Sequence, residues 1–202
     1  VDILTMGNHV IDNTEIFDYI NETNDLVVPG NVNYKQDVME NHKVVVYDFK
    51  GYKIKFINLL SIINNKAKLD ITNHLDYFDK VYEEDKNSIY IIDFHAEMTL
   101  AKNVMGYYAD GRASLVYGTH THVQTADEKT TENGMAYITD IGMTGPRKSV
   151  IGMDVDASIK RFLTSLPERY KVSEDKHTFM DACIVEFDDE NKTLGITLNL
   201  EE

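Results

Sequence analysis

Two histidines, His120 and His122, stand two positions apart in the run GTHTH at residues 118–122. An apolar run over residues 113–117 precedes them and predicts a buried strand. Alternate side chains of an extended backbone share a face, so we expect both imidazoles on one side. Neutral imidazole is a common ligand of transition metals. The pattern indicates a metal site, although a His-x-His pair on a polar loop would look the same.

Two further strand-like runs end in residues that can bind metal. Residues 1–6 lead to Asn8 and His9. Residues 88–94 lead to His95. Functional sites of α/β folds lie outside the carboxyl ends of the strands, so these segments are expected to meet the GTHTH run in one cleft. The other histidines stand among charged or amide residues and are predicted at the surface: His42, His74 and His177.

The segments that must position these residues alternate between strand and helix patterns. Strands are predicted at residues 1–6, 26–28, 43–49, 53–59, 88–94, 113–117, 135–140, 179–187 and 193–200. Helices are predicted at residues 14–20, 74–84, 99–107 and 157–166, the last closed by Pro167. Turns are predicted at residues 50–52 and 190–192, each inside a hairpin. The alternation indicates one α/β domain with mixed sheets over residues 1–202.

The composition excludes several classes of function. The chain has 202 residues, 43% of them hydrophobic, which is ample for a real core. Its net charge of −14 argues against unspecific binding to nucleic acid or to an anionic membrane. No apolar stretch approaches the length of a membrane span. The one cysteine, Cys183, is predicted to pack in the core and allows no disulfide within the chain, which fits a reducing cytoplasm.

The chemistry-bearing runs resemble a known family. The run Gly7-Asn8-His9, the histidine after a buried strand and the GTHTH run resemble the last three motifs of the calcineurin-like metallophosphoesterases. Longer motifs are similar to those of the bacterial YmdB-like branch, and they lie at residues 6–12, 93–97, 110–114, 118–127 and 137–146. The resemblance extends from the first residue to about Phe162, and the closing hairpin is compatible with it.

The resemblance implies a fold and an activity. The fold would be a calcineurin-like metallophosphoesterase sandwich, with two mixed β-sheets flanked by helices. The YmdB-like branch is described as 2′,3′-cyclic-nucleotide 2′-phosphodiesterases, so the implied substrate is a small phosphodiester or nucleotide. Carried over by position, Asn8, His95 and His120 would bind one metal of a binuclear centre and His122 the other. His9 would donate a proton to the leaving alkoxide.

Physical chemistry agrees with these implied roles. Two cations can bind the phosphoryl oxygens and generate hydroxide near neutral pH. An imidazole is suited to act as the general acid, because its pKa lies close to the working pH. Mixed nitrogen and oxygen ligands favour iron, manganese or zinc over magnesium, and the resemblance points to iron or manganese. Asp12 and Glu97 are candidates for orienting the ligands.

Two arginines are candidates for binding a phosphate or the substrate. Arg112, in the run Asp110-Gly111-Arg112, could clamp a phosphate, but we favour a structural turn with an ion pair. Arg147, which follows the run Thr144-Gly145-Pro146, could belong to a substrate rim or to a plain loop.

The chain departs from the family at its start. The family's opening motifs supply an aspartate to the first metal, then a bridging carboxylate with an adjacent asparagine. Their place precedes the Gly-Asn-His run, and this chain begins only seven residues before Asn8. By this count the first metal keeps only His122, while the second keeps three ligands. We therefore expect this chain by itself to bind metal weakly, to turn over poorly, and to expose a sheet edge that favours aggregation or early melting.

The leading hypothesis is a cytoplasmic binuclear metallophosphoesterase that acts on cyclic nucleotides. One alternative is a degenerate phosphoesterase fold with a binding or regulatory role, in which contacts to a second copy of the chain would matter. Another is an enzyme of the same superfamily that hydrolyses phosphomonoesters or phosphoproteins. Metal analysis would test the first alternative, and a substrate panel the second.

Overall fold

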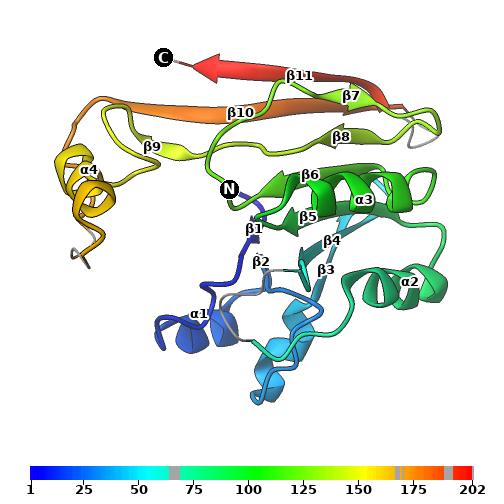
Figure 1. Cartoon of the computed structure of the whole chain (residues 1–202). Helices are drawn as coiled ribbons and strands as arrows, with labels where there is room; N and C mark the ends of the chain where they lie inside the picture. The colour runs from blue at the N-terminus through cyan, green and yellow to red at the C-terminus, as the bar shows by residue number, and fades with distance from the viewer. Residues whose placement is uncertain (64–68, 167–168, 170, 189–192, 202) are drawn as a thin grey trace.

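A six-stranded sheet forms the centre of the protein. The computed structural model describes residues 1–63, 69–166, 169, 171–188 and 193–201 (Figure 1). The strand order is β3-β4-β5-β6-β8-β7. The four inner strands run parallel, and each edge strand pairs antiparallel with its neighbour. The strands are β3 (Val44–Phe49), β4 (Tyr52–Leu60), β5 (Ile89–His95), β6 (Leu115–Thr119), β7 (Lys129–Thr130) and β8 (Ala136–Ile138).

Two smaller sheets complete the β structure. Strands β1 (Leu4–Thr5) and β2 (Leu26–Val27) form a short parallel pair. Strands β9 (Thr144–Pro146), β10 (Thr178–Phe187) and β11 (Thr193–Glu201) form an antiparallel sheet with β10 in the middle. In Figure 1 the long β10–β11 hairpin lies alongside β7 and β8, so the two larger sheets stack as a sandwich.

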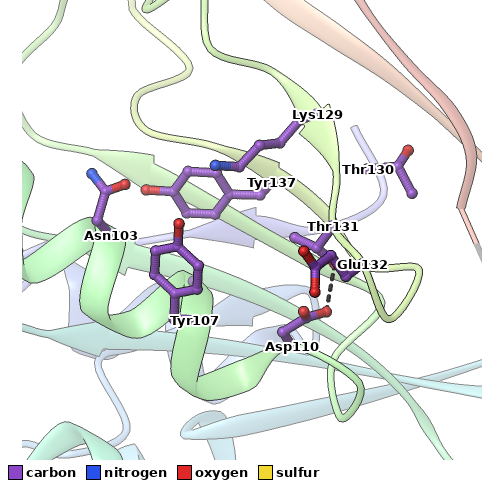
Figure 2. Close-up of a pocket in the computed structure, with 9 residues that line it drawn as sticks. Asn103, Tyr107, Asp110, Lys129, Thr130, Thr131, Glu132 and Tyr137 are labelled. Carbon is purple, nitrogen blue, oxygen red and sulfur yellow. Dashed lines mark hydrogen bonds between the residues drawn. The ribbon is translucent and has the colours of Figure 1, made fainter.

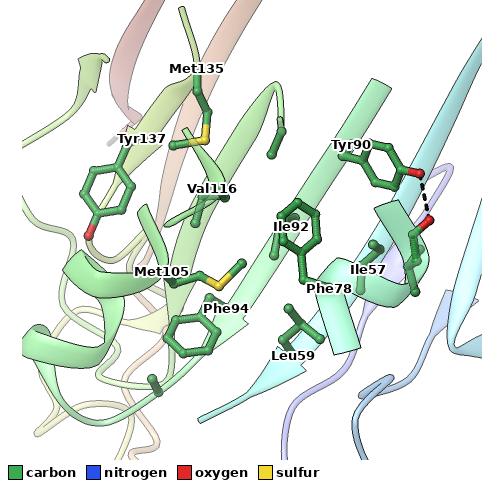
Figure 3. Close-up of a cluster of buried hydrophobic side chains, with 14 of the residues drawn as sticks. Ile57, Leu59, Phe78, Tyr90, Ile92, Phe94, Met105, Val116, Met135 and Tyr137 are labelled. Atoms are coloured by element: carbon green, nitrogen blue, oxygen red, sulfur yellow. Dashed lines mark hydrogen bonds between the residues drawn. The ribbon is translucent and has the colours of Figure 1, made fainter. Parts of the chain in front are cut away.

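Helices cover the central sheet and close the two cores. The helices are α1 (Ile16–Glu22), η1 (Asp37–His42, a 3-10 helix), α2 (His74–Glu84), α3 (Thr99–Ala109) and α4 (Val155–Thr164). Side chains of α2 and α3, among them Phe78 and Met105, pack on Ile92 and Phe94 of β5 (Figure 3). A second, smaller core forms between α1, η1 and β2, where Ile20 is fully buried. Helix α4 projects beyond β9 in Figure 1, and none of its side chains is buried.

Local sequence explains where these elements start and turn. The β3–β4 hairpin turns at Lys50 and Gly51, which both have positive φ angles, of 54° and 86°. Two such residues give the twist that a two-residue hairpin requires. Helix α2 begins after Asn73, whose side-chain oxygen accepts a hydrogen bond from the Leu75 amide at 2.9 Å. This cap satisfies one of the free amides of the first turn.

Most predicted elements are confirmed, with shifts of one to three residues at their ends. The mixed α/β class is confirmed. The buried strand predicted for residues 1–6 is wrong in its extent, because only Leu4 and Thr5 pair with β2 and Val1 is fully exposed. The predicted turn at residues 190–192 and the helix stop at Pro167 lie outside the described residues.

The surface positions predicted for two histidines are wrong. His42 and His74 are 4% and 5% exposed, whereas His177 is exposed as predicted. His42 Nδ1 lies 3.0 Å from the Leu26 carbonyl oxygen. The His74 ring packs against the Phe94 ring at 4.9 Å, because it begins α2 on the face that meets the sheet. Both histidines have polar neighbours in the sequence, so the sequence does not indicate that their rings are buried.

Among the described residues, no helix has the length and apolar character that crossing a membrane would require.

The burial of His74 predicts acid sensitivity. Burial lowers the pKa of His74 to about 4. Between this value and the unfolded value near 6.5, the unfolded chain binds more protons, so stability falls as the pH falls through this window. We expect this group to remove about 2–3 kcal/mol of unfolding free energy. Urea unfolding at pH 7.5 and pH 4.5 measures the loss.

Substitution identifies the group responsible. His74→Leu should reduce the difference in stability between the two pH values, whereas His177→Gln, at an exposed histidine, should leave it nearly unchanged. An identical pH dependence in wild type and His74→Leu would contradict the prediction.

Candidate metal centre

The parallel pairing of β5 and β6 brings the candidate ligands to one edge. His95, the last residue of β5, is in register with Thr119, the last residue of β6, and His120 follows at once. The arrowheads of both strands point toward the N-terminal segment in Figure 1. Asn8 enters the site from that segment, in the turn after β1. Three of the sequence-predicted ligands, Asn8, His95 and His120, therefore lie together.

The absence of a side chain at Gly7 permits the approach of the N-terminal segment. A Cβ atom at this position would overlap the His95 ring. The segment is tied to the sheet by Thr5, whose hydroxyl lies 3.2 Å from the Tyr117 hydroxyl. Gly7 and Thr5 together set the position from which Asn8 reaches the ring.

The ligand atoms of the three residues converge. His95 Nε2 lies 2.7 Å from Asn8 Oδ1 and 3.0 Å from His120 Nδ1. The two imidazole rings meet edge to face, with centroids 4.7 Å apart. Ligand atoms bound about 2.1 Å from one metal are separated by about 3 Å, so this spacing fits a shared cation.

Each ring has a hydrogen-bond partner on the side away from the other ligands. The Thr119 hydroxyl donates to Asp93 Oδ1 at 2.7 Å, and its oxygen lies 2.9 Å from His95 Nδ1. Glu97 Oε2 lies 2.9 Å from His120 Nε2, and a carboxylate accepts the proton of that nitrogen. His120 Nδ1 is thereby left with a lone pair, and His95 Nε2 offers one when the ring proton is on Nδ1.

The donor set fits a metal ion. His95 Nε2, His120 Nδ1 and the Asn8 amide oxygen face one another at contact distance. With the His95 proton on Nδ1 all three atoms are acceptors, and a positive charge between them would stabilise the group. The His95 ring is also kept neutral, because burial and the neighbouring His120 lower its pKa to about 3. Among the described residues no cluster of three or more His, Cys, Asp or Glu side chains is placed to hold a metal.

Burial raises the pKa of Asp93 to about 6, against hydrogen bonds from Thr119, Thr5 and Asn58 that favour the carboxylate. The side chain is ionised above this value and acts as the acceptor at the end of the His95 network.

His122 lies apart from the other predicted ligands. His120 and His122 have φ angles of 97° and 64°, so the backbone is not extended after Thr119. The expectation that alternation places both rings on one face is therefore wrong. His122 Nδ1 faces the Ile151 carbonyl oxygen at 3.3 Å, and within the described residues no hydrogen bond joins it to His95 or His120. Its assignment to a second metal stays a prediction.

His9 forms a pair with Asp12 at the rim of the site. His9 Nδ1 lies 2.6 Å from Asp12 Oδ2, and both side chains are largely exposed. The carboxylate orients the ring and leaves Nε2 toward solvent. Asp12 was expected to orient a ligand, but its partner is His9, the predicted proton donor, whereas Glu97 contacts the predicted ligand His120.

A buried ion pair that the sequence analysis missed holds the GTHTH turn. Lys102 Nζ lies 2.6 Å from Asp140 Oδ2, and the two side chains are 2% and 1% exposed. Asp140 also accepts from the amide and hydroxyl of Thr121, at 3.2 and 2.6 Å, and from the Gly142 amide at 2.9 Å. The signal lay in helix spacing, because Lys102 shares the buried stripe of α3 with Ala101 and other apolar residues.

Arg112 has a structural role, as we favoured. Its Nη1 lies 2.7 Å from Asp79 Oδ1, and its guanidinium stacks on the rings of Phe78, Tyr82 and Tyr108. Arg147 lines a cavity of about 530 Å³ together with His122. Its assignment to a substrate rim stays a prediction.

A pocket of about 310 Å³ lies away from the candidate ligands (Figure 2). Figure 2 shows Tyr107 and Tyr137 on one side and Asp110 at the other end. The Lys129 ammonium lies over both tyrosine rings, at 5.8 and 5.2 Å. None of the predicted ligands lines this pocket.

Comparison with known proteins agrees with the architecture. A protein-family model described as YmdB-like protein matches residues 1–198. A 2′,3′-cyclic-nucleotide 2′-phosphodiesterase of Bacillus subtilis is 42% identical over 196 residues, which cover 95% of this chain and 70% of that protein. A phosphatase structure from Mycoplasma pneumoniae superposes with a TM-score of 0.92 at 31% identity, covering 100% of this chain and 72% of the other.

A structure of a hypothetical protein from Thermus thermophilus gives a TM-score of 0.89 at 30% identity, over 100% of this chain and 76% of that one. The fold is that of the metallophosphoesterase enzymes, as predicted. The chain belongs to the YmdB-like protein family. The position of the ligands at the strand ends is consistent with that class.

The Lys102–Asp140 pair predicts a large cost of substitution. Asp140→Asn would leave the Lys102 ammonium buried without its counter-charge and weaken the acceptor of Thr121. Breaking a buried pair in this way costs about 3–5 kcal/mol. Urea unfolding at pH 7.5 measures the change in unfolding free energy. As a control, Glu83→Gln removes the exposed pair with Lys86 and should cost less than about 1 kcal/mol. Equal, small losses in both variants would contradict a structural role for the buried pair.

Proposed function

We propose that this protein is a metal-dependent phosphodiesterase that hydrolyses 2′,3′-cyclic nucleotides or related small phosphodiesters. The observation that carries the proposal is the convergence of three neutral acceptors, from Asn8, His95 and His120, at the ends of the central strands. Membership of the YmdB-like family supports the reaction, and the named Bacillus subtilis relative supports the substrate class. A cytoplasmic location is part of the proposal, supported by the single cysteine.

The metals proposed are two ions, with iron or manganese favoured by the nitrogen and oxygen ligands. Asn8, His95 and His120 would hold one ion, and His122 would contribute to the other. When bound, the ions supply Lewis-acid activation of the phosphoryl group and a hydroxide near neutral pH. Because the three converging ligands are neutral, they leave the positive charge of a cation available to an anionic substrate.

The chain's own residues would complete the reaction. His9 stands beside the proposed ligand Asn8 and is exposed at the rim. Asp12 holds the His9 ring through Nδ1 and would direct its Nε2 atom toward the substrate. The Nε2 proton would pass to the leaving alkoxide oxygen as the phosphorus–oxygen bond breaks.

Loss of a proposed ligand should abolish hydrolysis. In the protein at its full natural length, with manganese or iron and 2′,3′-cyclic AMP, His120→Ala should reduce kcat by more than about 100-fold, because even residues that only support ligands contribute 10–100-fold. His177→Ala, at an exposed histidine outside the site, serves as the control. Chelation should remove the activity and metal should restore it. Metal-independent hydrolysis, or none by the wild type, would refute the proposal.

The role of His9 has a separate signature. His9→Gln should slow hydrolysis of 2′,3′-cyclic AMP by about 10²–10⁴-fold, the usual contribution of a general acid. A p-nitrophenyl phosphodiester needs little protonation of its leaving group, so its hydrolysis should be much less affected. Steady-state rates with both substrates test this difference. An equal loss with both would assign His9 to positioning instead.

Phosphomonoesterase activity is the second candidate, because the superposed Mycoplasma pneumoniae structure is described as a phosphatase. Rates with 2′,3′-cyclic AMP, adenosine monophosphates and a phosphoserine peptide distinguish the two. Faster turnover of the cyclic substrate supports the diesterase, and faster turnover of either monoester supports the phosphatase.

A further inference from the structure

A cavity of about 530 Å³ opens beside His122, between the segment that follows the GTHTH run and the β9–β10 strand pair. This volume lies within the range of small-molecule sites, about 300–1,000 Å³. Its lining combines a cation, amide and hydroxyl groups, and apolar side chains, among them Arg147, Gln124, Thr125, Met143 and Phe179. Of the residues described in this lining, the proposed reaction uses His122 alone.

We infer that this cavity binds the nucleoside phosphate on which the site acts, with Arg147 holding the phosphate and Phe179 contacting the base. The inference deepens the proposed function and rests on it for the identity of the ligand. Both residues would determine affinity and selectivity, and neither would take part in breaking the phosphorus–oxygen bond.

The register of β9 and β10 directs both side chains to one face. Phe179 is paired with Gly145, and beyond the end of β9 the Arg147 amide donates to the His177 carbonyl oxygen at 2.8 Å. Arg147 is therefore opposite His177, two positions from Phe179. Residues that are opposite one another across an antiparallel pair share a face, and so do alternate residues of one strand. The cation and the ring thus reach the cavity from the same side.

Gly145 leaves the Phe179 ring accessible from the neighbouring strand. It is directly opposite Phe179 and stands by alternation between Met143 and Arg147. A Cβ atom at this position would overlap the end of the Met143 side chain. Since no side chain covers the ring from here, a planar base can lie against it. Stacking of this kind accepts any base, because every base has a π-face.

The Arg147 guanidinium is available to an anion. Arg147 is exposed, and in the part of the chain that the structure describes no hydrogen bond or ion pair uses its side chain. Arg112, by contrast, is paired with Asp79 and stacked on Tyr108. A guanidinium binds phosphate oxygens through two parallel hydrogen bonds. Arg147 therefore has the chemistry and the freedom to hold a phosphate, which Arg112 lacks.

The loop after β9 joins Arg147 to the His122 end of the cavity. The Ser149 hydroxyl accepts a hydrogen bond from the Gly152 amide at 3.0 Å, which closes the loop. Within this loop the Ile151 carbonyl oxygen lies 3.3 Å from His122 Nδ1. An anion bound by Arg147 is therefore held on the side of the candidate metal centre.

A carboxylate marks the other end of the same face. Asp181 Oδ2 accepts from the Met143 amide at 3.1 Å, just before β9 begins, whereas Arg147 follows the end of β9. Alternate residues of a strand are about 7 Å apart, so cation, ring and carboxylate follow one another at this spacing. An anion would avoid Asp181, and an amino group would be attracted to it. A nucleotide fits this order, with its phosphate at Arg147, its base on Phe179 and a base amino group toward Asp181.

Binding can be measured without metal or turnover. The probe is 3′-AMP, the monoester left when the 2′ bond of 2′,3′-cyclic AMP breaks. It is titrated by calorimetry into the protein at its full natural length, with a chelator present. Arg147→Gln should weaken Kd at least about 10-fold, because charge-assisted hydrogen bonds are lost. Lys148→Gln removes the next cation in the chain, which is exposed and outside the described lining, and should leave Kd unchanged.

The aromatic contact has its own pair of variants. Phe179→Ala should weaken Kd for 3′-AMP at least about 5-fold, the lower end of the contribution of base–aromatic stacking. Phe179→Tyr keeps the ring and should bind like the wild type. Phe162→Ala, at an exposed ring of α4 outside this cavity, is the control. Because Arg147 is exposed, Arg147→Gln tests the inference even if Phe179→Ala fails to fold.

The outcomes separate this inference from the proposed function. An unchanged Kd in Arg147→Gln or in Phe179→Ala, or no binding of 3′-AMP by the wild type, would overturn the inference. Binding that depends on both residues supports it, even if the metal-loaded wild type fails to hydrolyse 2′,3′-cyclic AMP. That failure would refute the proposed function and leave the nucleotide site standing.

Discussion

The rest of the site depends on the interactions of the buried Asp140 carboxylate. It joins helix α3 through Lys102, the GTHTH turn through Thr121, and the segment after β8 through Gly142. The turn needs this support because His120 and His122 adopt positive φ angles, which cost about 1–3 kcal/mol each. A charge buried beside its counter-charge cannot move without a large penalty. The ligand-bearing turn is therefore fixed from behind, by the same interaction that attaches the helix to the sheet.

The charges are arranged so that the converging ligands are neutral and the carboxylates stand one step further away. Asn8 and two imidazoles face the shared position. Glu97 supports His120 directly, and Asp93 supports His95 through a hydroxyl. Negative charge is thus used to orient nitrogen atoms and is kept from neutralising a cation locally. In a chain with a net charge of −14, this separation is what would let an anionic phosphoester approach.

The sequence was sufficient to predict the strand ends and that the three candidate ligands meet there, because apolar runs followed by histidine are typical of the strand ends of a parallel sheet. It could not predict the turn at His122, since a positive φ in a non-glycine residue is imposed by tertiary contacts. Two buried polar residues could have been found from helix spacing. His74 was assigned to the surface because of its polar type, and Lys102 was not singled out, yet helix spacing places each on a buried face.

A buried and an exposed carboxylate suit different tasks in this site. His95 must present one nitrogen at a fixed point, and the buried Asp93 gives it a partner that solvent does not weaken. His9 must bring a proton to a leaving group and then recover one from water, so its pair with Asp12 lies at the rim, where both side chains are exposed. A buried acid would keep its orientation but exchange its proton slowly. The division between half-buried candidate ligands and an exposed candidate acid therefore fits what each residue would have to do in the proposed reaction.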